Sequence, residues 1–201
     1  AIVTDAQDYK LIEDALNQND GALNLECRFN LAKKAFEHTA KYDAAISNYL
    51  NGLDTNKNLA YPNKLNLAFN KKIDLRYGEN PHQSASFYVD EISNKGSLAS
   101  FKQLQGKELS YNNLNDADAA WECVKSFKLA SCVIVKHANP CGVSINNNKL
   151  KSYKMALACD PISAFGGIVS LNFKINKKIA IELNKIFLEV VIANGFDSEA
   201  L

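Results

Sequence analysis

A short, continuous apolar run near the middle of the chain predicts a strand that is buried on both faces. Residues 132–135 are β-branched at three of four positions, and the run ends in Lys136 and His137. We expect Pro140 and Gly142 to stop the strand in a turn over residues 138–142. Open α/β sheets bind their ligands at the carboxyl ends of such strands. Lys136 and His137 are therefore candidates for a functional site.

The two candidate side chains share a site only if the backbone leaves strand geometry between them, since successive strand side chains point to opposite faces. The predicted turn over residues 138–142 would provide that departure. A solvated lysine at a strand end, followed by a hydrogen-bonded loop histidine, is the structural alternative. The pattern alone leaves both interpretations open.

The residues around this run alternate between helical and strand-like segments. Asn115 or Asp116 is expected to cap a helix whose apolar stripe comprises Ala120, Trp121, Val124 and Phe127. Further helices are predicted over residues 149–158 and 177–187, and strands over 85–89, 168–173 and 190–193. Such alternation favours a largely parallel sheet covered by helices.

The first 50 residues contain helical patterns after a short strand-like start at residues 1–4. Asp5 is expected to cap a first helix, and a longer helix follows over residues 26–50. Its apolar stripe comprises Phe29, Ala32, Phe36, Ile46 and Leu50. Residues 51–70 are rich in Asn, Gly and Pro, which predicts an extended connection and a domain boundary. One strand and two helices are too little to close a core, so we expect this chain to be part of a longer one.

Composition and charge narrow the class of protein. The chain has 201 residues, of which 47% are hydrophobic and 22% charged, and its net charge is +1. Nothing in that balance indicates a nucleic-acid or acidic-membrane partner. No apolar run approaches the roughly 18 residues of a membrane span, and no signal-like segment is present. The odd number of cysteines, without a C-x-x-C pair, predicts reduced thiols in a cytoplasmic protein and no zinc site (Cys27, Cys123, Cys132, Cys141 and Cys159).

Two further motifs carry possible chemistry. His137 and Cys141 are the base and nucleophile of a rival interpretation, a cysteine-dependent hydrolase. A zinc deaminase is excluded because Asn139 replaces the glutamate of its signature and Ser144 replaces its second cysteine. Residues 163–167 (Ser-Ala-Phe-Gly-Gly) form a small loop that would let a ligand approach the backbone, although a tight turn needs no ligand.

Several long blocks together resemble one family, the bifunctional AICAR transformylase/IMP cyclohydrolases of purine biosynthesis. The blocks are LRYGENPHQ (75–83), LQGKELSYNNLNDADAAW (104–121), VKHANPCG (135–142) and CDPISAFGGIV (159–169), and the similarity continues over residues 34–50 and 189–196. The resemblance implies that residues 1–50 close a cyclohydrolase domain with a methylglyoxal-synthase-like α/β fold. Residues 51–64 would be a linker, and residues 65–201 the first part of a cytidine-deaminase-like transformylase domain.

The resemblance also implies roles for individual residues. The catalytic pair of the family falls on Lys136 and His137. Substrate contacts fall on Arg76, Tyr77, Gly166 and Glu189, and the folate side falls on Phe165 and Ile162. No functional match is claimed for Ser144 and Asn194.

The implied reaction transfers a formyl group from 10-formyltetrahydrofolate, a co-substrate, to the 5-amino group of AICAR. The parent protein would also cyclise the product, FAICAR, to IMP. Similar enzymes are homodimers with shared active sites. Their transformylase is not a zinc enzyme, and we expect no metal in this segment. We therefore expect this chain to be inactive alone, as a non-catalytic piece of a larger enzyme, and we expect no nucleic-acid or membrane partner.

Overall fold

The computed structural model describes residues 1–91 and 96–201. The chain divides into two units, Ala1–Ala68 and Phe69–Leu201, and each is considered by itself. The second unit contains both sheets and all of the predicted site residues.

The first unit contains two helices, α1 (Tyr9–Gln18) and α2 (Leu25–Asn51). Asp5 caps a 3₁₀ turn that leads into α1, where its carboxylate accepts the N–H of Gln7 at 2.9 Å. Residues 1–5 adopt no regular structure, so the strand expected at residues 1–4 is wrong. This unit offers no neighbouring strand with which those residues could pair, and an unpaired strand is not stable in water.

The apolar stripe of α2 is largely exposed. Phe29, Phe36 and Leu50 are 62%, 76% and 61% exposed, whereas Leu31, outside the predicted stripe, is 4% exposed. Within residues 1–68, which the structure describes throughout, Leu31 and Asp8 are the buried residues. The apolar face of α2 therefore has the periodicity of a packed helix without a packing partner in its own unit.

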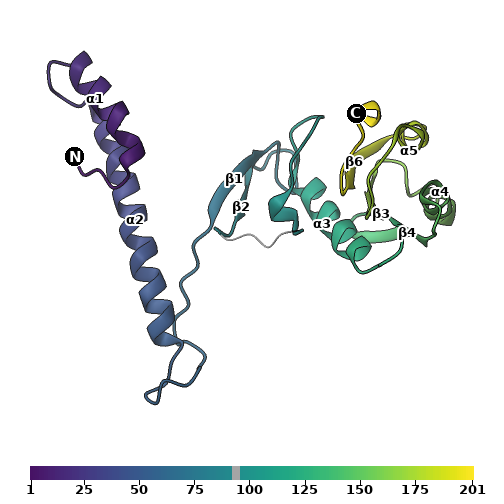
Figure 1. Ribbon diagram of the computed structural model, residues 1–201, viewed down its shortest axis with the longest axis horizontal. Helices are drawn as coiled ribbons and strands as arrows, with labels where there is room; N and C mark the ends of the chain where they lie inside the picture. The colour runs from purple at the N-terminus through teal and green to yellow at the C-terminus, as the bar shows by residue number, and fades with distance from the viewer. Residues whose placement is uncertain (92–95) are drawn as a thin grey trace. The chain divides into compact units, whose positions relative to one another are not determined.

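The second unit contains a two-stranded and a four-stranded sheet (Figure 1). The small antiparallel sheet pairs β1 (Asn70–Leu75) with β2 (Ala85–Val89). The large sheet has the order β4-β3-β5-β6 and is formed by β3 (Ser131–Lys136), β4 (Asn139–Ile145), β5 (Gly167–Leu171) and β6 (Leu188–Ala193). Its helices are α3 (Tyr111–Lys125), α4 (Lys149–Cys159) and α5 (Lys177–Leu183).

The large sheet is buried on both faces, as the apolar run at residues 132–135 predicts. Val133 and Val135 pack against the α3 side, and Cys132 and Ile134 pack with residues of α4 and α5. Figure 1 shows α3 on one side of β3 and α4 with α5 on the other. Burial on both faces explains why this strand is apolar at every position instead of alternating.

The expectation of a largely parallel sheet is wrong, because the sheet is mixed. Strand β3 runs antiparallel to both of its neighbours, β4 and β5, whereas β5 and β6 are parallel. A hairpin directly after β3 reverses the chain, so β4 and the later strands β5 and β6 share one direction. The helix–strand alternation therefore holds from β4 onward, and β3 is the strand that differs.

Strand β4 was not predicted, because its small residues are buried and its apolar residues are exposed. Gly142 and Ser144 are buried, whereas Val143 and Ile145 are 38% and 45% exposed. A Cβ at Gly142 would lie 2.1 Å from the carbonyl oxygen of Ala156, so only glycine lets α4 pack this closely. Because β4 is an edge strand, it also tolerates Pro140 within its ladder.

Replacing Gly142 with alanine is expected to lower the free energy of unfolding by about 1–3 kcal/mol, the usual cost of overpacking. The added methyl group forces α4 away from β4. Urea denaturation followed by circular dichroism measures the change. Val143→Ala, at the exposed neighbouring position, is the control and should change stability by no more than about 0.5 kcal/mol. Equal stability of Gly142→Ala and the unmodified chain would contradict this account of the β4–α4 contact.

Helix α3 begins earlier than expected. Ser110, and neither Asn115 nor Asp116, is its cap. The hydroxyl of Ser110 accepts the N–H of Asn113 at 3.2 Å, and the side-chain oxygen of Asn113 accepts the N–H of Ser110 at 3.0 Å. This reciprocal pair is a capping box with asparagine in place of the usual Glu or Gln. Residues 111–115 therefore form the first turns of α3, ahead of the expected start of the helix.

Candidate functional site

Lys136 and His137 lie at the tip of the β3–β4 hairpin. Lys136 pairs with Asn139 across the ladder, so His137 and Ala138 form a two-residue turn. Their φ angles are +53° and +57°, and positive φ at both central residues is the signature of the tight turns that suit hairpin twist. The backbone thus leaves strand geometry at His137 itself. The turn expected over residues 138–142 is wrong, because Asn139–Ile145 forms β4.

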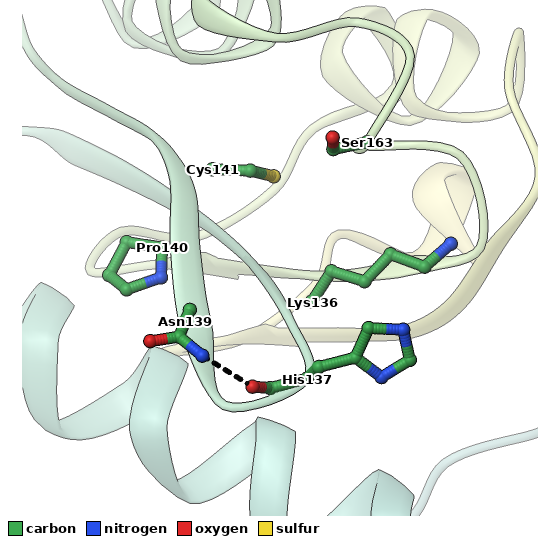
Figure 2. Close-up of a pocket in the computed structure, with 6 residues that line it drawn as sticks. All are labelled: Lys136, His137, Asn139, Pro140, Cys141 and Ser163. Carbon is green, nitrogen blue, oxygen red and sulfur yellow. Dashed lines mark hydrogen bonds between the residues drawn. The ribbon is translucent and has the colours of Figure 1, made fainter.

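A cavity of about 400 Å³ opens beside this hairpin tip. Figure 2 shows the side chains of Lys136 and His137 extending to the same side of the hairpin, away from Pro140. His137 is exposed and Lys136 is half-buried. The cavity is lined by Lys136, His137, Asn139, Pro140, Cys141 and Ser163. Of the predicted site residues, the structure places the lysine and the histidine at one cavity.

The ammonium group of Lys136 is held against the glycine turn that precedes β5. Its Nζ donates to the carbonyl oxygen of Phe165 at 2.5 Å. Gly166 has a φ of +68°, and a Cβ there would lie 3.4 Å from the same Nζ. Glycine at this position therefore satisfies a backbone conformation that side chains disfavour, next to the ammonium group.

The two apolar residues predicted for the folate side lie near this glycine turn on the chain. Phe165 is 58% exposed, and its ring centroid is 5.7 Å from that of Phe187. Ile162 is 86% exposed. Neither residue lines the cavity, although Ser163 between them does. Both side chains expose apolar surface, and both are close in sequence to the carbonyl group that Lys136 contacts.

Arg76 and Tyr77 follow β1 and are held together by two contacts. The guanidinium carbon of Arg76 lies 4.9 Å from the centroid of the Tyr77 ring, and Nη2 donates to the Tyr77 hydroxyl at 3.3 Å. The backbone of both residues is tied to the start of α3. The Arg76 N–H donates to the carbonyl of Leu109 at 2.8 Å, and the Tyr111 N–H donates to the carbonyl of Tyr77 at 3.0 Å.

Glu189 is an exposed residue near the start of β6. Its carboxylate accepts a hydrogen bond from the side-chain amide of Asn113. The other end of that amide belongs to the capping box, so Asn113 is fixed from both sides. The carboxylate of Glu189 is thus oriented by the first turn of α3.

The side chain of Asp116 connects the hairpin turn to α3. One carboxylate oxygen accepts the N–H of His137 at 3.1 Å, and the other accepts the N–H of Ala138 at 2.7 Å. The first two turns of α3 therefore contact three separate predicted site segments: the Arg76–Tyr77 loop, Glu189 and the hairpin turn. These contacts link the segments through the helix; they do not place all of the predicted residues at the one cavity.

The residues that make these links were missed as functional candidates. Asp116 was predicted only as a candidate helix cap, and Ser110 and Asn113 were assigned no role. The spacing of Ser110 and Asn113 is the signal that could have found the helix start. No local pattern indicates that Asp116 would contact a turn 21 residues away.

The environment of Cys141 does not favour a nucleophile. Burial raises the pKa of its thiol, and the negative charge of Asp160 acts in the same direction. The thiol donates to the carbonyl oxygen of Ile134 at 3.6 Å. Because the thiolate is the reactive form, these contacts favour an unreactive thiol. Cys141 lines the same cavity as His137, but the raised pKa of its thiol disfavours the cysteine-dependent hydrolase.

The described part of the chain comprises residues 1–91 and 96–201. Within those ranges, no group of three or more His, Cys, Asp or Glu side chains is arranged to hold a metal ion. Among the helices of the described part of the chain, none combines the length and apolarity needed to cross a bilayer.

The comparison with known families agrees with the resemblance of the sequence blocks. Residues 1–201 match the family described as AICARFT/IMPCHase bienzyme. That description names an AICAR formyltransferase and an IMP cyclohydrolase, two activities of purine biosynthesis. The match covers the helical first unit as well as the mixed α/β second unit. The chain belongs to the AICARFT/IMPCHase bienzyme family.

Proposed function

We propose that this chain supplies the Lys136–His137 pair for formyl transfer from 10-formyltetrahydrofolate to the 5-amino group of AICAR, which gives FAICAR and tetrahydrofolate. One observation carries the proposal: a turn with positive φ lets a lysine and a histidine, adjacent in sequence, line one cavity. In the intact enzyme, the cyclohydrolase activity then closes FAICAR to IMP.

The reaction needs a base because the amine is a weak nucleophile. Its lone pair is delocalised into the imidazole ring and the carboxamide, so its proton must leave as the bond to the formyl carbon forms. Histidine titrates near neutral pH and suits this role. His137 is exposed at the hairpin tip and lines the cavity. Its imidazole accepts the amine proton as the bond to the formyl carbon forms.

Lys136 stabilises the negative charge that develops on the formyl oxygen. An ammonium group has three N–H donors, and one of them is used by the carbonyl of Phe165 at 2.5 Å. That contact fixes Nζ while the remaining donors stay available to the substrate. A positioned cation at the developing oxyanion is the kind of interaction that lowers a transition-state barrier most.

The remaining residues divide between the two substrates. Arg76 binds the phosphate of AICAR, because a guanidinium offers a planar fork of donors, and the stacked Tyr77 supports it. Gly166 and Glu189 contact the nucleotide, with Glu189 oriented by Asn113. The exposed side chains of Phe165 and Ile162 supply apolar surface for the folate.

The family match supports the assignment of successive segments of the chain to two catalytic domains and a linker. Residues 1–50 form the end of the cyclohydrolase domain, with a methylglyoxal-synthase-like fold, and residues 51–64 form the linker. Residues 65–201 begin the cytidine-deaminase-like transformylase domain. The intact enzyme is a cytoplasmic homodimer whose active sites are shared between subunits. The 201-residue chain alone is therefore inactive with AICAR and 10-formyltetrahydrofolate, and formation of FAICAR by this chain alone would contradict that part of the proposal.

Replacing Arg76 with alanine in the intact enzyme is expected to raise the KM for AICAR by about 10- to 100-fold. A hydrogen bond to a charged group contributes about 1.5–3 kcal/mol, and each 1.4 kcal/mol is a factor of ten in affinity. The KM for the folate should stay nearly constant. Steady-state kinetics with each substrate varied in turn measures both values.

Arg28→Ala is the matched control, because Arg28 is the other arginine of the chain and lies exposed on α2. It should leave both KM values unchanged. An Arg76→Ala enzyme with the AICAR KM of the unmodified enzyme would remove Arg76 from the phosphate site.

A further inference from the structure

The hairpin turn that carries His137 adopts a backbone conformation that its own residues do not favour. Both His137 and Ala138 have positive φ, and this region is sterically disfavoured for residues with a Cβ. Histidine tolerates it better than most residues, but alanine has no polar side chain with which to stabilise it. Something outside the turn must therefore hold this conformation.

The backbone groups of the turn are held by two side chains. The carboxylate of Asp116 accepts both N–H groups, from His137 at 3.1 Å and from Ala138 at 2.7 Å. The side-chain amide of Asn139 donates to the carbonyl oxygen of His137 at 2.7 Å, the contact drawn in Figure 2. His137 is thus fixed on both sides of its Cα.

Asp116 is attached to a rigid part of the second unit. Its neighbours on α3, Leu114 and Ala117, are 7% and 3% exposed and belong to the core between α3 and the large sheet. The capping box fixes the start of the same helix. The carboxylate therefore extends from a packed helix to the turn, and its position does not depend on a loop.

We propose that Asp116 is a positioning residue for formyl transfer: by clamping the two N–H groups of the His137–Ala138 turn, it fixes the direction in which the imidazole enters the cavity. This inference rests on the proposed role of His137 as the base. A carboxylate suits the task because two parallel donors need two acceptor oxygens, whereas an asparagine side chain offers one oxygen and a donor that opposes the second N–H.

The test is Asp116→Asn in the intact enzyme. A small misplacement of a catalytic group can cost about 100-fold in rate, so kcat should fall by about that factor. The KM for AICAR should change by less than about 2-fold, since Asp116 contacts the turn and not the binding residues. Asp118→Asn, at an exposed carboxylate of the same helix, is the matched control and should leave kcat unchanged.

A second readout separates positioning from a general loss of stability. Amide hydrogen exchange at His137 and Ala138 should accelerate by about 10-fold or more in Asp116→Asn, while the amides of β3 and β5 keep their protection. Asn172→Ala serves as the stability control. The Asn172 side chain holds the opposite end of β3 through Ser131, Phe127 and Leu129. It should lower Tm without lowering kcat.

A rescue variant completes the test. Glycine adopts positive φ without a steric penalty, so Ala138→Gly in the Asp116→Asn background should recover a substantial part of kcat. The double variant also keeps the test decisive if Asp116→Asn alone folds poorly. A kcat within about 2-fold of the unmodified enzyme in Asp116→Asn, or unchanged exchange at both turn amides, would overturn the inference.

The two proposals fail in different ways. Normal turnover in a His137→Ala enzyme would refute the proposed base and leave the exchange result at the turn intact. Unchanged exchange in Asp116→Asn would refute the clamp and leave the role of His137 intact.

Discussion

Replacing His137 with alanine in the intact enzyme is expected to abolish formyl transfer while AICAR still binds. The substitution removes the group that accepts the proton of a poorly nucleophilic amine, and it leaves Arg76 and Tyr77 in place. Formation of tetrahydrofolate measures the transfer, and calorimetric titration with AICAR measures the binding. The AICAR Kd should change by no more than a few-fold, because His137 acts mainly in the transition state.

His38→Ala is the control for this experiment. His38 is exposed on α2, far along the chain from the hairpin, and its removal should leave turnover and AICAR binding unchanged. Near-normal turnover in the His137→Ala enzyme would remove His137 from the mechanism, whatever the binding result.

Replacing Lys136 with alanine is expected to lower kcat by about 100-fold or more, by analogy with the loss of one oxyanion donor. The side chain that disappears holds a cation against the carbonyl of Phe165, next to Gly166. Steady-state kinetics measures kcat.

Lys151→Ala provides the matched loss of charge at an exposed site on α4. It should leave kcat unchanged. A Lys136→Ala enzyme with the kcat of the unmodified enzyme would refute the proposed role of the lysine.

A strand could be predicted from the sequence where its buried positions carry apolar side chains. Strand β3 is apolar at successive positions because helices cover both faces of the sheet, so its burial was predictable. Strand β4 was not, because Gly142 and Ser144 occupy its buried positions and a close helix replaces the usual apolar contacts. Missing one strand was enough to assign the wrong direction to β3.

The candidate site shows the same division between local and tertiary information. Lys136 and His137 stand out as titratable residues at the end of a buried run, and the structure places both at one cavity. The hydrogen bond that Asp116 accepts from His137 and the one that Asn113 donates to Glu189 join residues 21 and 76 positions apart. Such contacts depend on how α3 packs on the sheet, and no periodicity within a single segment encodes that packing.

The β3–β5 ladder has a consequence for how the site meets its substrates. Lys136 ends β3 and the Phe165–Gly166 turn leads into β5, and the two strands pair through Val135 with Ile168 and Ile134 with Val169. Backbone hydrogen bonds therefore set the spacing between the ammonium group and the glycine turn. The Lys136 ammonium group and the Phe165–Gly166 turn are thus preorganised before any ligand binds. Binding energy from AICAR and the folate is therefore not needed to bring them together.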